Sequence, residues 1–316
     1  MQINKFKLFV TGHTGLLGNS LIRLIDRKKY SLVLNNQKLD LTDNKICETF
    51  FKTQKPDYVI NLAAKVGGIR SNLDNKEIYL NKNTFLQLNI INCCWKYKIK
   101  KLINIGSNCI YPRNITRNIR EKDLLKGELE ETNEGYALAK ILGVKLCQYY
   151  NQKYNTEFLT LMPANLYGPF DNYKNESSHV VPALINKICS AKKKKKKFIE
   201  IWGSGKPIRD FLFVDDCSKA IIFFLEKNCK NFIKRKNIHY INIGSGIGTS
   251  IANLAKMIKN ISGYKGRFIY KTQYPDGHKR KVLDINLAKK LGFNCNSNLK
   301  KNLTSTISWF ILNKLK

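Results

Sequence analysis

Short apolar runs alternate with helical patterns along the first half of the chain. Each apolar run is followed by a stretch whose apolar residues recur three and four positions apart, the spacing of an amphipathic helix. The run at 58–63 is apolar nearly throughout, which is typical of a strand buried on both faces. This order predicts a parallel sheet with helices on both of its faces.

The predicted elements of this first half are regular and closely spaced. Strands are predicted at 5–11, 31–34, 58–63, 101–105 and 158–162. Helices are predicted at 16–27, 46–54, 78–97 and 134–154. Together they indicate a Rossmann-type, doubly wound α/β fold.

The pattern changes after Pro163, where loops lengthen and glycine, proline and aromatic residues become frequent. Further elements are predicted at 198–202, 211–214 and 241–243 (strands) and at 216–227 (a helix). We expect residues 1–165 to form a dinucleotide-binding domain and residues 166–316 to form mainly a smaller C-terminal substrate-binding lobe. Segments around 211–243 are expected to return to the first domain. A cleft between the two parts is the usual place for a small-molecule site.

The composition is that of a folded globular protein, with 43% hydrophobic and 25% charged residues. No apolar stretch is long enough to span a membrane, and the N-terminus has the pattern of a first strand and not of a secretory signal. The nine cysteines show neither CxxC pairs nor metal-like spacing, which favours free thiols in a reducing compartment and argues against a metal site. We therefore expect a cytoplasmic protein.

The formal charge of +33 is extreme and would attract polyanions. Lysines occur throughout the chain, however, including the run at 192–197, and asparagine and isoleucine are also abundant. This favours a compositional bias over a designed binding face. No dedicated nucleic-acid or membrane partner is expected.

A glycine-rich turn follows the first predicted strand directly. Gly12, Gly15 and Gly18 have the spacing GxxGxxG and open a predicted helix. The first glycine permits the tight turn, the second lets the backbone approach a pyrophosphate, and the third allows close helix packing. The free N–H groups at the helix start then receive the anion. The turn predicts a dinucleotide site.

The choice between NAD and NADP depends on the end of the second predicted strand. An acidic residue there would bind the ribose 2′-hydroxyl of NAD, but the sequence has Asn35 and Asn36. NAD is therefore disfavoured. Asp40 and Leu41 follow shortly afterwards, where they are placed to meet the adenine.

Three polar residues predict acid–base chemistry. Tyr136 and Lys140 lie one turn apart on one face of a predicted helix. A nearby ammonium favours phenolate, so we expect Lys140 to lower the pKa of Tyr136. Ser107 follows the strand predicted at 101–105 and is placed to hydrogen-bond the same substrate oxygen that Tyr136 protonates.

Serine, tyrosine and lysine behind a glycine-rich turn are the pattern of the short-chain dehydrogenases. Five further segments resemble one extended branch of them: AAKVGGI (63–69), SNCIYP (107–112), PANLYGP (163–169), SHVVP (178–182) and WGSG (202–205). Through them nearly the whole chain resembles the GDP-L-fucose synthases. The motifs around Cys109 and His179 are specific to these enzymes among their relatives.

The resemblance implies a two-part reaction, in which GDP-4-keto-6-deoxy-D-mannose is epimerised at C3 and C5 and reduced at C4 by NADPH to GDP-L-fucose. Cys109 would remove each acidified proton, and His179 would return a proton from the opposite face. Tyr136 would then protonate the C4 oxygen, with Ser107 holding that oxygen and Lys140 holding both Tyr136 and the nicotinamide ribose.

The resemblance also implies binding residues and an assembly. The implied cofactor-binding residues are Gly12, Thr14, Gly15, Leu16, Leu17, Gly18, Asp40, Leu41, Ile105, Gly106, Lys140, Pro163, Asn165, Leu166 and His179. The implied substrate-binding residues are Lys187, Trp202, Arg209 and Asp276, with Arg280 and Lys281 adding cationic reach. Family members pair as homodimers through the helices that correspond here to 78–97 and 134–154.

Some positions depart from the family pattern or have a second interpretation. Thr14 and Asn35–Asn36 stand where relatives carry arginines for the NADP 2′-phosphate, Lys187 replaces an arginine, and Asn108 replaces a second serine. Arg209 has a purely structural alternative, an ion pair with Asp210 or Asp215.

Two other functions are also compatible with the sequence. One is a different nucleotide-sugar epimerase or dehydratase, because these enzymes share the tyrosine and lysine; the Cys109 and His179 pair distinguishes them. The other is a non-catalytic, dehydrogenase-like RNA-binding protein, which the high positive charge would suit.

Overall fold

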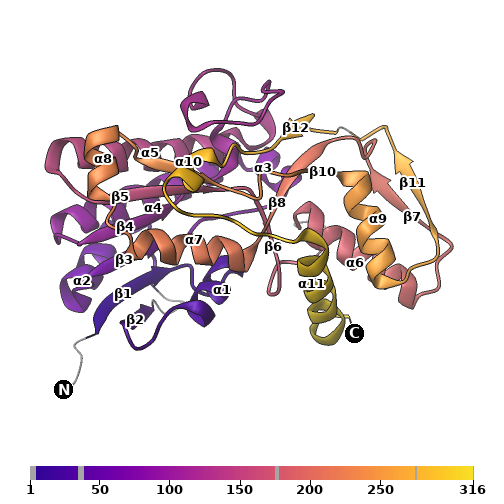
Figure 1. Cartoon of the computed structure of the whole chain (residues 1–316), viewed down its shortest axis with the longest axis horizontal. Helices are drawn as coiled ribbons and strands as arrows, with labels where there is room; N and C mark the ends of the chain where they lie inside the picture. The colour runs from indigo at the N-terminus through magenta and orange to yellow at the C-terminus, as the bar shows by residue number, and fades with distance from the viewer. Residues whose placement is uncertain (1–4, 35–38, 175–177, 275, 316) are drawn as a thin grey trace.

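A computed structural model describes residues 5–34, 39–174, 178–274 and 276–315. Six parallel strands form the central sheet in the order β2-β1-β3-β4-β5-β9 (Figure 1). Their bounds are β1 (Phe6–Thr11), β2 (Tyr30–Leu34), β3 (Tyr58–Asn61), β4 (Lys101–Ile105), β5 (Phe158–Pro163) and β9 (Tyr240–Ile243). The strand from 240 to 243 thus joins the sheet from far along the chain.

Helices cover both faces of this sheet, because alternate strand residues point to opposite sides. Leu8 and Val10 belong to the core shared with α1 (Leu16–Leu24) and α7 (Val214–Glu226), whereas Phe9 belongs to a second core. The helices of that second core are α2 (Asn44–Gln54), α4 (Lys76–Lys96) and α5 (Glu134–Tyr154). The predicted doubly wound α/β fold is confirmed.

Several predicted boundaries differ from the structure, among them these three. The strand predicted at 58–63 ends at Asn61, since the N–H groups of Leu62 and Ala63 donate to the Thr11 hydroxyl at 3.0 Å and not to a neighbouring strand. The helix predicted at 16–27 ends at Leu24, because the backbone of Ile25 is extended. Val214 does not end a strand but begins α7.

Buried polar side chains connect the carboxyl ends of the middle strands. Thr11, Asn61 and Asn104 occupy paired positions on β1, β3 and β4. The Thr11 hydroxyl donates to Asn61 Oδ1 at 2.8 Å, and Asn61 Nδ2 donates to Asn104 Oδ1 at 2.9 Å. Because a shift by one residue would break both bonds and bury their partners unpaired, this row stabilises the strand register.

The second part of the chain forms a smaller lobe with its own core (Figure 1). Its helices are α6 (Val180–Lys193), α9 (Ile251–Ser262) and α11 (Leu299–Asn313), which pack beside the parallel pair β7 (Phe198–Trp202) and β11 (Arg267–Lys271). Ile185, Leu254 and Ile307 lie in this core. The domain division near residue 165 remains a prediction, and Leu283 and Phe293 pack in the α1/α7 core of the main sheet.

A second small sheet and several short helices complete the chain. The strands are β6 (Asn165–Tyr167), β8 (Ile208–Phe213), β10 (Gly248–Ser250) and β12 (Arg280–Lys281). β8 pairs with each of the other three. The short helices are α3 (Ile69–Asp74), α8 (Lys230–Lys236) and α10 (Asn286–Lys290). None of the helices in the described part of the chain combines the length and apolarity needed to cross a bilayer.

A buried ion pair anchors the returning segment to the amino edge of the sheet. Lys101 Nζ lies 2.8 Å from Glu157 Oε1, and both side chains are largely buried. Lys101 also donates to the carbonyl of Leu225 at 2.9 Å, and Glu157 accepts from the N–H of Cys229 at 2.8 Å. The pair therefore links β4 and β5 to the last turn of α7 and to the chain that follows it.

We expect Lys101→Met to lower the free energy of unfolding by about 3–5 kcal/mol, because Glu157 would remain charged, buried and unpaired. Denaturant unfolding monitored by circular dichroism measures the loss. The double variant Lys101→Met/Glu157→Leu should recover most of it, since no unpaired charge is left. An equal loss in the single and the double variant would contradict this account.

Candidate active site

The glycine-rich turn has the geometry of an anion cradle. Gly12 has φ +63°, and a Cβ there would lie 2.9 Å from the backbone nitrogen of Ala63. A Cβ on Gly18 would lie 2.4 Å from the carbonyl oxygen of Gly12. Gly15 is the N-cap of α1 and offers no side chain to the free N–H groups of that helix start. The turn thus leaves the backbone donors open, which fits a pyrophosphate.

The other predicted cofactor residues lie around the carboxyl edge of the sheet. Asp40 accepts from the N–H and the hydroxyl of Thr42, at 2.9 and 2.7 Å, and these bonds lower its pKa. Leu41 is buried in the second core, so only its backbone is free for a ligand. Asn165 Nδ2 donates to the Asp210 carbonyl at 2.9 Å. Asn35 and Asn36, on which the choice of cofactor depends, lie outside the described residues.

Ser107, Tyr136 and Lys140 come together where β4 ends. Ser107 follows β4 and accepts a hydrogen bond from the Cys109 N–H at 3.2 Å, while its hydroxyl also bonds to the Tyr136 phenol. Tyr136 and Lys140 lie in the first two turns of α5, and Lys140 Nζ is 5.9 Å from the centre of the Tyr136 ring. Residues about thirty positions apart in sequence thus share one site.

The expected lowering of the Tyr136 pKa is wrong. Burial raises the pKa of Tyr136 well above its ordinary value of 10, Cys109 adds to the increase, and the bond to Ser107 opposes it. Lys140 is fully buried, and its ammonium donates to the Ile105 carbonyl at 2.7 Å and lies 5.9 Å from the centre of the Tyr136 ring. Desolvation therefore outweighs the cation. Tyr136 is protonated at neutral pH, the form that a proton donor needs.

Cys109 and His179 were predicted to act as a pair. In the described part of the chain, only Cys109 contacts the group formed by Ser107, Tyr136 and Lys140. Its sulfur is partly exposed and lies 3.4 Å from Asn133 Nδ2 and 3.8 Å from Asn108 Oδ1. His179 is the N-cap of α6, and within the described chain its ring has no hydrogen-bond partner. The ring is exposed to solvent although the surrounding protein lowers its pKa by desolvation, a combination that fits a concave surface.

Two cations lie near Cys109. Arg209 Nη1 donates to the carbonyls of Ile208 and His278, at 2.9 and 2.6 Å. The alternative ion pairs are not formed, since Asp210 accepts from Ser245 and Asp215 accepts from Arg23. Their absence leaves the Arg209 charge available to a ligand.

Lys281 is the second of these cations. It is 5% exposed, burial lowers its pKa, and Cys109, Arg209 and Glu130 act on it electrostatically. Its ammonium has no hydrogen bond or ion pair within the described chain. A buried ammonium of this kind favours an anionic ligand, because an unpaired charge is costly to bury.

An exposed aromatic stack borders these cations. Trp202 and Tyr274 stack with ring centres 4.6 Å apart, and they are 66% and 40% exposed. Lys187 Nζ lies 6.0 Å from the Trp202 ring and donates to the Glu200 carbonyl at 2.7 Å. Asp276 accepts from the N–H and hydroxyl of Ser204, at 2.7 and 2.6 Å, which ties the segment after β11 to the end of β7. The predicted substrate residues thus form one surface.

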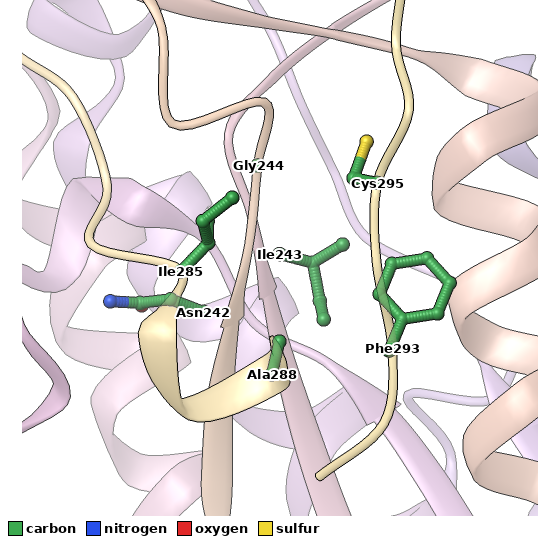
Figure 2. Close-up of a pocket in the computed structure, with 7 residues that line it drawn as sticks. All are labelled: Asn242, Ile243, Gly244, Ile285, Ala288, Phe293 and Cys295. Carbon is green, nitrogen blue, oxygen red and sulfur yellow. The ribbon is translucent and has the colours of Figure 1, made fainter. Parts of the chain in front are cut away.

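Two hollows elsewhere carry no comparable chemistry. Figure 2 shows an apolar gap where Ile243 ends β9 and Gly244 follows it, opposite Ile285, Ala288 and Phe293. The gap has no room for a water molecule. A hollow of about 440 Å³ lies along the 112–128 segment beside Arg117 and Asp123, which pair with each other. Among the described residues no three histidine, cysteine or acidic side chains gather as metal ligands.

Two residues of this region were not predicted from the sequence. Tyr274 lies in an irregular segment with no motif, and Asn133 precedes α5, where an asparagine ordinarily indicates only a helix cap. Neither position carries a signal of a site, because their neighbours come from distant parts of the chain. Only the structure brings them beside Trp202 and Cys109.

Comparison with known proteins places the chain in a family. The sequence profile described as "NAD dependent epimerase/dehydratase family" matches residues 8–244. The chain is 40% identical over 309 residues to putative GDP-L-fucose synthase 2 of Arabidopsis thaliana, covering 97% of this chain and 92% of the relative. It is 37% identical over 316 residues to GDP-L-fucose synthase of Escherichia coli (strain K12), covering 99% and 98%.

A solved structure agrees with these relatives. The GDP-L-fucose synthetase from Naegleria fowleri bound to NADP matches 100% of this chain and 97% of its own, with a TM-score of 0.87 and 27% identity. The agreement extends over both the sheet and the smaller lobe. The chain therefore belongs to the NAD-dependent epimerase/dehydratase family and, within it, to the group of the GDP-L-fucose synthases.

Proposed function

We propose that this protein converts GDP-4-keto-6-deoxy-D-mannose to GDP-L-fucose, by epimerisation at C3 and C5 and NADPH-dependent reduction at C4. The observation that carries the proposal is the group of Ser107, Cys109 and Tyr136 at the carboxyl end of β4. It combines a protonated phenol with a thiol, which are the two kinds of group that the two reactions need. Near full-length similarity to GDP-L-fucose synthases supports the same conclusion.

In the reduction, the side chains of the protein transfer one proton to the substrate. Tyr136 donates it to the C4 oxygen, and Ser107 holds that oxygen through its hydroxyl. Lys140 stabilises the tyrosinate that results, because its ammonium lies near the phenol ring. NADPH, when bound, supplies the hydride. The open backbone donors of the 12–18 turn would hold its pyrophosphate.

In the epimerisation, the C4 ketone acidifies the protons at C3 and C5. Cys109 removes each proton as a thiolate, and His179 returns one from the other face of the ring, so that both centres invert. Desolvation lowers the pKa of His179, which makes the imidazolium a stronger acid for that return.

Cationic and aromatic side chains bind successive parts of the substrate. Arg209 and Lys281 bind the diphosphate beside Cys109, and Lys187 adds a third cation. Trp202 offers its face to the rest of the nucleotide. Asp276, tied to Ser204, lies at the same end.

We further propose NADP as the preferred cofactor, a homodimer and a cytoplasmic location. The relative from Naegleria fowleri has NADP bound. Large apolar side chains on α4 and α5 are exposed, including Phe85, Trp95 and Tyr149. Such a patch fits a self-complementary interface, and sedimentation should give twice the mass of one chain.

The reduction should lose rate as the pH rises through about 8. Burial lowers the pKa of Lys140 to about 8, whereas Tyr136 stays protonated over this range. Lysine is charged below its pKa and neutral above it, so the stabilising charge disappears in alkaline solution. We expect kcat/KM for reduction to be level below pH 7.5 and to fall about tenfold per pH unit well above 8. A profile that rises over this range would contradict the role of Lys140.

One incubation tests the proposed function. The protein is mixed with GDP-4-keto-6-deoxymannose, NADPH and NADH are followed separately by absorbance, and the product is identified by NMR. Formation of GDP-L-fucose with faster NADPH use supports the proposal. An unepimerised 4-hydroxy sugar as product would favour another nucleotide-sugar enzyme, and no turnover together with RNA affinity that falls steeply with salt would favour the RNA-binding alternative.

A further inference from the structure

Asn133 stands at a helix start but does not cap the helix. It is the N-cap residue of α5, a position where an asparagine side chain ordinarily accepts a hydrogen bond from the first turn. That bond is absent here within the described residues, and the side chain lies against Cys109 instead, with Nδ2 3.4 Å from the sulfur. α5 therefore lacks a side-chain cap, and the Asn133 amide contacts Cys109, the proposed base, instead.

The Cys109 sulfur contacts a hydrogen-bond acceptor from one side-chain amide and a hydrogen-bond donor from another. Asn108 Oδ1, at 3.8 Å, is an acceptor, and Asn133 Nδ2 is a donor. A thiol has one proton and can donate only once, so the second amide must donate to the sulfur. After the thiol proton has left, the Asn133 bond becomes a charge-assisted bond, which is roughly twice as strong as a neutral one.

In each of the two amides, the polar atom that does not contact the sulfur is buried and has no hydrogen-bond partner among the described residues. Asn108 Nδ2 and Asn133 Oδ1 make no hydrogen bond to any described residue, and Asn108 is 4% exposed. Buried amide groups are ordinarily satisfied, so orphaned ones inside a site indicate that a functional constraint fixes their orientation. The other groups that act electrostatically with Cys109 are Tyr136, Arg209 and Lys281.

We infer that Asn133 is a positioning residue that holds and stabilises the Cys109 thiolate through its side-chain N–H. The inference rests on the proposed function only in taking Cys109 as the epimerisation base. It explains why an asparagine at this helix start is turned away from the helix.

Alkylation of Cys109 by iodoacetamide tests the inference without substrate. Of the nine cysteines, only Cys109 and Cys295 are not buried, so a Cys295→Ser background leaves one accessible thiol. In that background Asn133→Ala should slow alkylation at neutral pH about tenfold, because a bond to a charged sulfur is lost. Asn133→Asp has the same shape but carries a negative charge, and it should slow alkylation further.

Stability and activity measurements separate this role from a structural one. Neither variant loses a cap bond, so the midpoint of thermal unfolding should stay that of the parent. Asn75→Asp is the matched control, because Asn75 is the uncapped N-cap of α4, and its alkylation rate should equal the parent's. With substrate, Asn133→Asp should slow deuterium exchange at C3 and C5 more than reduction of a pre-epimerised ketone.

The outcomes distinguish this inference from the proposed function. Unchanged alkylation in both folded variants would overturn it, and so would faster alkylation in Asn133→Asp. Slower alkylation in a protein that turns over no sugar nucleotide would uphold the inference and refute the proposed function.

Discussion

Replacing Tyr136 with phenylalanine should lower the rate of C4 reduction by about 10²–10⁴-fold, the usual contribution of a positioned proton donor. The physical reason is the hydroxyl that burial keeps protonated and that bonds to Ser107. Exchange of the C3 and C5 protons should continue, because Cys109 and not the phenol removes them. NADPH consumption with a pre-epimerised ketone measures the reduction, and deuterium uptake with NADP⁺ in place of NADPH measures the exchange.

Tyr58→Phe is the matched control for this variant. Tyr58 begins β3 at the amino edge of the sheet, opposite the site, so removal of its hydroxyl should change neither rate. A Tyr136→Phe protein that reduces the ketone at the parental rate would show that another group supplies the proton. Solvent would then be the simplest donor.

Replacing Cys109 with serine should have the reverse effect. Deuterium uptake at C3 and C5 should fall by about 10²–10⁴-fold, because a hydroxyl in the same place is a far weaker acid than a thiol and supplies little anion at neutral pH. Reduction of the pre-epimerised ketone should fall much less. NMR of the recovered sugar nucleotide resolves the two carbon positions.

Cys295→Ser controls for the loss of an accessible sulfur, since Cys295 lies by the apolar gap near β9 (Figure 2). It should leave both rates unchanged. If Cys109→Ser and Tyr136→Phe lost both activities to the same extent, the two steps would not be divided between these residues. The proposed mechanism would then be wrong even if the overall reaction were right.

Local patterns carried most of the predictions about the fold. The strand at 101–105, the helix at 134–154 and the strand at 198–202 agree with the structure at both ends, because periodicity within one element depends on near neighbours. One of the errors arose where a distant group intervened. The strand at 58–63 is shortened by the Thr11 hydroxyl, which lies 51 positions from Leu62 in the chain.

The site shows the same division between near and distant neighbours. Tyr136 and Lys140 were predicted as a pair because one helical turn separates them. The sign of the Tyr136 pKa shift was not predicted correctly, since it depends on how completely the folded chain excludes water. Likewise the orientation of Asn133 depends on Cys109, which reaches it only through packing of α5 beside the end of β4.

The amino-acid order alone determined the alternation of strands and helices, the anion-binding turn and the set of reactive side chains, since each is encoded within a few adjacent residues. Tertiary structure alone decided which segments meet. Residues 203–209 face residues 271–274 and 276–278 through the Gly203–Lys271, Ser204–Asp276 and Arg209–His278 bonds, which join residues about seventy positions apart. Contacts at that separation follow from the burial and strand pairing of the whole chain, and no local pattern contains them.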